Sequence, residues 1–82
     1  MATGLINKRV NDLQDNINKQ TFVVKDADGY LQDYNKSRKL YKLINLYNKE
    51  QVEQAKESAQ KEIKQNTEEV KVLNDTKKKL EE

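Results

Sequence analysis

The side chains that most often carry catalysis are missing from this chain. Its 82 residues include no histidine and no cysteine, so the usual general base and nucleophile–base pairs are absent. Ser37 and Ser58 lie in a segment of helical pattern with no candidate base beside them. The acids are spread over helical faces, which is typical of solvated surfaces and i,i+4 ion pairs. We therefore expect a protein that is not an enzyme, with no catalytic residue and no cofactor.

One short acidic segment resembles part of a calcium-binding loop. Asp26 and Asp28 precede Gly29, as two acids precede the obligatory glycine of an EF-hand. The position of the first ligand is occupied by Val24, and that of the final bidentate glutamate by Asn35. Two essential oxygen ligands are thus missing. The sequence predicts a turn at this point and no metal site.

A basic, tyrosine-containing segment is the best argument for nucleic acid. Residues 30–49 hold five basic side chains and one acid, a balance of +4, whereas the whole chain carries only +2. Such cations could contact phosphates, and tyrosines could stack on bases. However, Tyr30, Tyr34 and Tyr41 share the hydrophobic arc of a helix, which favours burial of their rings. Nucleic acid is therefore a secondary partner in this interpretation. The candidate contacts are Lys36, Arg38, Lys39 and Lys42.

These side chains must be positioned by helices. From Tyr30 to Leu80 the chain has no glycine or proline, and apolar residues recur at steps of three and four. A single helix of that length would be roughly 75 Å long, far longer than a compact domain of this size. Only 34% of residues are hydrophobic and 37% are charged, which is poor for a monomeric core. The fold class is predicted as all-α and extended, with helices stabilised by association.

Three zones follow from the pattern. Residues 1–20 form a short amphipathic helix that begins near Thr3. Residues 21–29 interrupt the helical pattern and are interpreted as a connector. In the alternative interpretation, Phe22–Lys25 and Tyr30–Gln32 pair as a small β-hairpin, and the long helix starts nearer Asp33. Residues 30–82 form one long helix with coiled-coil character.

Within the long helix, residues 40–47 are apolar almost all round. This width exceeds that of a two-stranded seam, so a further element must cover the extra face. Either the 1–20 helix folds back over it, or another protein binds there. A membrane surface is a third option, but the segment spans only two turns and has few bulky anchors, so no membrane partner is expected. We refer to this set as the docking cluster: Leu40, Tyr41, Leu43, Ile44, Leu46 and Tyr47.

A heptad repeat extends over residues 63–80. Ile63, Val70 and Lys77 fall at position a, and a β-branched residue at a with Leu at d favours a parallel dimer. Between Ile44 and Ile63 the stripe runs through Ala55 and Ala59, which bury little area. The heptad tail predicts self-association, and its oligomerisation residues are Ile63, Asn66, Val70, Leu73 and Leu80.

In overall appearance the chain resembles the small helical virion-assembly proteins, of scaffolding or inner-core type, of tailed phages that infect low-GC Gram-positive bacteria. The abundance of Lys and Asn and the absence of Pro indicate AT-rich coding, as in such genomes. Membership would imply binding to the inner face of a capsid protein, close to packaged DNA.

We therefore expect a structural or assembly protein whose long helix docks onto other protein subunits. It would be located in the cytoplasm or inside a virion, because the sequence contains neither a membrane span nor a signal-peptide core. The alternative is a small basic helical protein associated with nucleic acid or with regulation.

Overall fold

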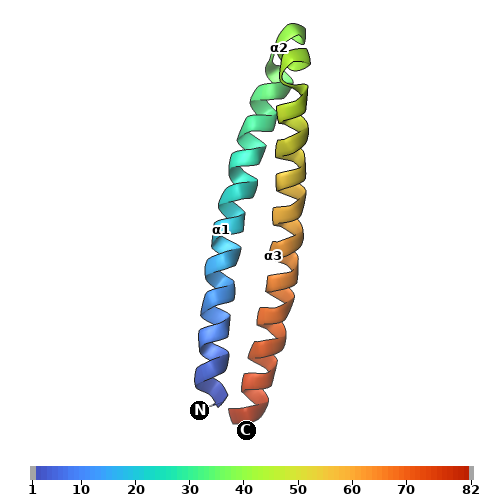
Figure 1. Ribbon diagram of the computed structural model, residues 1–82. Coiled ribbons are helices and arrows are strands. Elements are labelled where there is room, and N and C mark those ends of the chain that lie inside the picture. The colour runs from blue at the N-terminus through green and yellow to red at the C-terminus, as the bar shows by residue number, and fades with distance from the viewer. Residues whose placement is uncertain (1, 82) are drawn as a thin grey trace.

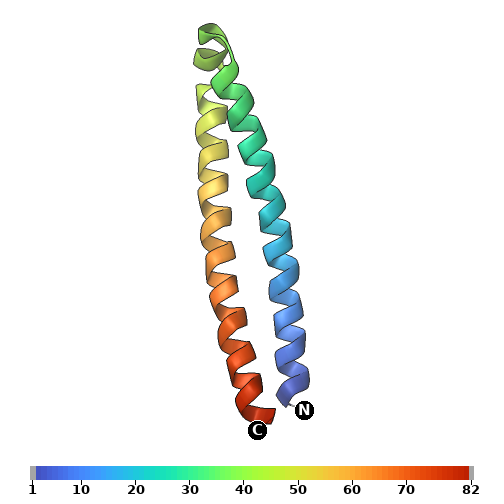
Figure 2. The same ribbon diagram turned by 180° about the vertical axis from the view of Figure 1, so that it is seen from behind.

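Two helices of nearly equal length lie side by side and run in opposite directions. The computed structural model describes residues 2–81, which form α1 (Ala2–Lys36), the short α2 (Lys39–Ile44) and α3 (Leu46–Glu81). The termini meet at one end of the hairpin and α2 lies at the other end (Figures 1 and 2). The Cα trace measures 62 × 16 × 14 Å, with a radius of gyration of 18.3 Å. A compact chain of this length would have a radius of about 12 Å.

The all-α class and the order of N-terminal helix, connector and long helix are confirmed. The placement of the connector was wrong. Residues 21–29 are helical and belong to α1, so neither a bent connector nor a β-hairpin forms there. Gly29 lies inside the helix without a positive φ. The reason is tertiary, because Val24, Ala27 and Leu31 continue the seam of residues 1–20 without interruption.

The chain reverses between Ser37 and Asn45, with no glycine or proline. Helix α1 ends in a tight turn, in which the Ser37 N–H donates to the Tyr34 carbonyl at 3.0 Å. The Ser37 hydroxyl donates to the Asp33 carbonyl at 2.7 Å, a local bond that competes with helix continuation. Arg38 is then extended, with φ −70° and ψ 157°. The single helix predicted over residues 30–82 is therefore broken twice, at Ser37–Arg38 and at Asn45.

The two long helices share a heptad seam. Along each helix, buried or half-buried residues recur at alternating steps of three and four, as expected for knobs-into-holes packing. On α1 the seam comprises Ile6, Val10, Leu13, Ile17, Gln20, Val24, Ala27, Leu31 and Tyr34. On α3 it comprises Lys49, Val52, Lys56, Ala59, Ile63, Asn66, Val70, Leu73 and Lys77.

Lysines occupy two seam positions of α3, one of them beside Ala55, which the sequence pattern had placed in the seam. Lys49 and Lys56 are half-buried, whereas Ala55 is exposed. Their aliphatic stems cover the seam while their ammonium groups find partners at its edge. The Lys49 ammonium lies 5.5 Å from the centre of the Tyr34 ring and 3.2 Å from a carboxylate oxygen of Glu53. The Lys56 ammonium pairs with the carboxylate of Asp28.

The residues predicted to mediate a parallel dimer pack instead within the chain. Val70 is buried, and Ile63, Asn66 and Leu73 are half-buried in an antiparallel seam with α1 (Figure 1). Leu80 is exposed. The heptad residues do lie in a seam, but the helix they pack against belongs to the same chain. The pattern of one helix does not say which chain supplies its partner helix. Any self-association must therefore use another face.

Candidate docking surface at the hairpin tip

All six residues of the docking cluster are exposed. They lie on α2 and on the first turn of α3, at the end of the hairpin farthest from the termini (Figure 1). Leu40, Ile44 and Tyr47 keep about 70% of their surface accessible, at 68%, 72% and 70%. Of the two alternatives for covering this cluster, the 1–20 helix is excluded, because these residues pack along the opposite end of α3. A group of neighbouring large apolar side chains left exposed is typical of a binding site.

Tyr34 attaches the tip to the rest of the hairpin. It is buried, and its hydroxyl donates to the Lys42 carbonyl at 2.8 Å. That carbonyl lies in the last turn of α2, where backbone acceptors lack helical partners. The Tyr34 ring also faces the ring of Tyr41, with centroids 6.5 Å apart. One side chain of α1 thereby contacts α2 directly and α3 through Lys49.

Asn45 shapes the junction between α2 and α3. Its backbone N–H and its side-chain amide both donate to the Tyr41 carbonyl, at 2.9 and 3.0 Å. Its own carbonyl accepts the Lys49 N–H at 2.9 Å, which starts α3. These bonds fix the orientation of Leu43, Ile44 and Leu46, so the docking cluster is presented on an ordered backbone.

The tip is also strongly basic. Residues 36–49, which we call the tip, contain five cations and no acid, whereas residues 1–35 sum to −1 and residues 50–82 to −2. The four predicted nucleic-acid contacts all lie here. Lys36, Arg38 and Lys39 are exposed and Lys42 is half-buried. The structure thus brings the predicted cations and the docking cluster together at one end of the hairpin.

A second surface, which was not predicted from the sequence, lies on the side of the hairpin. Phe22 and Val23 were assigned to the connector, but on α1 they are 66% and 38% exposed. Beside them lies Tyr30, whose hydroxyl oxygen is buried without a hydrogen-bond partner among the described residues. Burial of this phenol, with smaller effects from Tyr41 and Tyr34, raises the pKa of Tyr30 above its ordinary value. This surface can be identified only once residues 21–29 are known to be helical, because the helix then sets which side chains face outward.

Comparisons with protein-family models, with curated proteins and with solved structures found no match to this chain. The geometry of the surfaces must therefore carry the functional argument. None of the helices within residues 2–81 is both long and apolar enough to cross a membrane.

Proposed function

We propose that this protein is a non-enzymatic assembly component that docks onto another protein subunit through the tip of its hairpin. The observation that carries the proposal is the docking cluster, in which six neighbouring apolar or aromatic residues remain exposed on an ordered backbone. Aromatic and large aliphatic side chains are the groups that dominate binding energy when a partner buries them.

The charge around the cluster indicates the chemistry of the partner. Five cations flank the apolar side chains and no acid lies between Asp33 and Glu50. A complementary partner would offer an apolar groove with an acidic rim, which would accelerate association and disfavour incorrect partners. The apolar contacts would supply most of the affinity, and the rim charges would set the orientation.

More specifically, we propose that the chain is an internal or scaffold-like component of a phage virion and that it binds a capsid protein. The resemblance to small helical virion-assembly proteins supports this assignment, as does a narrow rod with a binding surface at one end. Mass spectrometry of purified particles from the source genome tests it, since a resident component is recovered in fixed ratio to the capsid protein.

The alternative function is association with nucleic acid through the tip cations. The clustering of Lys36, Arg38, Lys39 and Lys42 favours it. The narrow cross-section of the tip limits the number of phosphates that can be contacted at once. Each phosphate contact contributes about −0.9 to the slope of log affinity against log salt, so these four cations allow a slope no steeper than roughly −3.6.

The experiment is affinity capture from the cells that naturally make the protein, followed by binding of the captured partner in purified form. Wild type is compared with the double variant Leu43→Asp, Ile44→Asp, at 50 mM and 500 mM salt. Leu5→Asp is the matched control, because Leu5 is equally exposed, at 74%, but lies near the termini. Mixed-sequence duplex DNA and phosphatidylglycerol vesicles serve as parallel probes.

Docking predicts that a purified protein partner binds wild type and the Leu5→Asp variant at both salt concentrations and fails to bind the double variant. Circular dichroism should show unchanged helix content in the double variant, because both positions are exposed. Binding to DNA alone, lost at high salt, would favour the alternative function. Binding to vesicles alone would replace the protein partner with a lipid surface.

A further inference from the structure

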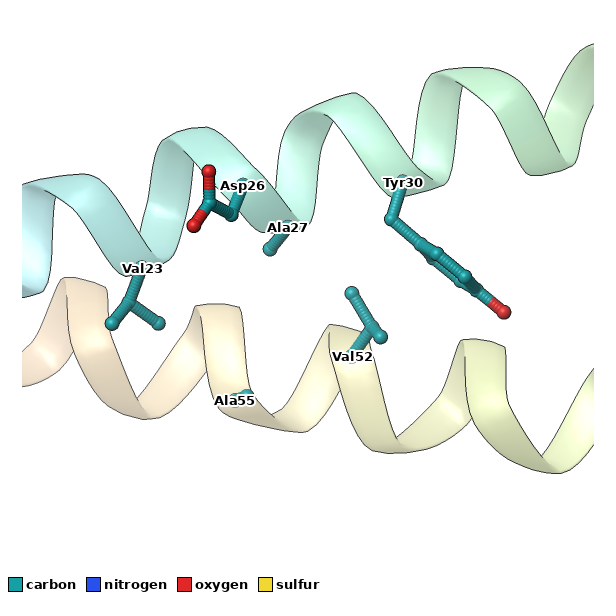
Figure 3. Close-up of a pocket in the computed structure, with 6 residues that line it drawn as sticks. All are labelled: Val23, Asp26, Ala27, Tyr30, Val52 and Ala55. Carbon is teal, nitrogen blue, oxygen red and sulfur yellow. The ribbon is translucent and has the colours of Figure 1, made fainter.

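A shallow groove lies on one side of the hairpin, away from the docking cluster. It has a volume of about 220 Å³ and is lined by Val23, Asp26, Ala27, Tyr30, Val52 and Ala55. Figure 3 shows side chains of α1 and α3 projecting into the space between the two helices. We call it the side groove. Except for Asp26, its lining is apolar or aromatic.

Phe22 stands next to the side groove. It precedes Val23 and lies one helical turn from Asp26, so it shares the same side of α1. With 66% of its surface exposed, the ring has little contact within its own chain. An exposed aromatic knob beside an apolar groove is self-complementary, since each of two copies can offer both parts.

Charge is also distributed unevenly around α3 at this level. The flank of α3 that continues the side groove carries Gln51, Ala55 and Ser58, all uncharged and exposed, and Glu62 follows one turn farther along. The opposite flank, by helical periodicity, carries Glu50, Glu53 and Glu57. Uncharged, small side chains beside the groove allow a second helix to approach without the desolvation of ions.

We propose that a second copy of this chain occupies the side groove, with the two α1 helices antiparallel and the Phe22 ring of each copy in the groove of the other. Close to the two-fold axis the charges on α1 match this direction, whereas farther out Asp12 of each copy faces Asp33 of the other. Lys19 lies three residues before Phe22, and Asp26 lies three residues after Val23. Antiparallel pairing centred between Phe22 and Val23 places Lys19 of each copy opposite Asp26 of the other, whereas parallel pairing opposes like charges.

The surface area of the hairpin is sufficient for such an interface. Its accessible surface is 6668 Å², whereas a compact monomer of 9.6 kDa would expose about 5,100 Å². A standard interface removes about 800 Å² from each partner. The hairpin thus exposes about 1,600 Å² more than a compact chain of this mass, which is twice the area that one partner loses in a standard interface.

The antiparallel dimer separates the two tips. Each tip carries five positive charges, so a parallel arrangement would add repulsion at one end of the bundle. Residue 39 lies about 16 residues beyond the two-fold axis, which gives roughly 25 Å on each side and about 50 Å between tips. The dimer would therefore present one docking cluster at each end.

Sedimentation equilibrium of the full chain tests the association, independently of any docking partner. We expect wild type to dimerise and Phe22→Asp to weaken the dimer at least tenfold. Val72→Asp is the control, because Val72 is 62% exposed but distant from the groove. Asp26→Lys should weaken the dimer, and the double exchange Lys19→Asp, Asp26→Lys should restore it. Circular dichroism checks that each variant remains helical.

The direction of pairing is tested by spin labels. The chain has no cysteine, so Lys39→Cys provides a single labelling site at the tip. Pulsed electron paramagnetic resonance should report a distance near 50 Å between the two labels. A wild-type monomer at all concentrations, a dimer that Phe22→Asp leaves intact, or a label distance below about 25 Å would each overturn the proposal. None of these outcomes bears on docking at the tip.

Discussion

Replacement of Gly29 by alanine distinguishes a helix from a turn over residues 21–29. In the structure Gly29 lies in the interior of α1, its φ is not positive, and no atom lies within 4 Å of the position that a Cβ would occupy. Alanine therefore meets no steric obstacle. It also reduces the conformational entropy that the unfolded chain must lose.

The expected magnitude follows from helix propensity. In an exposed helix interior, glycine is less favourable than alanine by about 0.8–1.0 kcal/mol. The free energy of unfolding should rise by about that amount, and the melting temperature by roughly 4–8 °C for a domain of this size. Thermal and urea denaturation followed by circular dichroism at 222 nm measure both quantities, at one protein concentration because association would add to stability.

Gly4→Ala is the matched control. Gly4 also has open space at its Cβ position, but it lies in the first turn of α1, where helices fray. Its replacement should stabilise the chain by less than about half as much. If Gly29→Ala lowers the stability instead, Gly29 occupies a turn that needs glycine, and the continuous α1 is refuted.

Three further substitutions test the contacts between the helices. Tyr34→Phe removes the hydrogen bond to the end of α2 and should lower the free energy of unfolding by about 1 kcal/mol; the same change at exposed Tyr47 should have no measurable effect in urea denaturation. Asp28→Asn breaks the ion pair with Lys56 and should cost no more than about 1 kcal/mol, because both groups are partly exposed; a loss that persists in 1 M salt would contradict this reasoning. The raised pKa of Tyr30 means that the folded chain retains this proton to higher pH than the unfolded chain, so stability should fall as pH rises above 10.0. In Tyr30→Phe this part of the decline should disappear from a pH series of melting curves, and an unchanged decline would assign it to other groups.

The residues of the candidate site could be predicted from the sequence, but their arrangement in space could not. The docking cluster and the tip cations were identified from the sequence because they are contiguous, and local patterns describe contiguous residues well. The role of Tyr34 could not be identified, since its contacts with Lys42 and Lys49 cross a chain reversal. Phe22 was misassigned for a related reason, because a β-branched run followed by Asp and Gly is locally typical of a turn.

The helical class, the extended shape and the lack of the usual catalytic side chains follow from residue type and from spacings of three and four. Both are local properties that can be read along the chain. The position of the chain reversal and the pairing of α1 with α3 depend on contacts between residues far apart in the sequence. Over residues 21–29 a helix and a turn differ little in local free energy, because one glycine costs about 1 kcal/mol in a helix. Packing of α1 along the whole length of α3 outweighs it, so residues 21–29 remain helical and the chain turns instead at Ser37–Asn45.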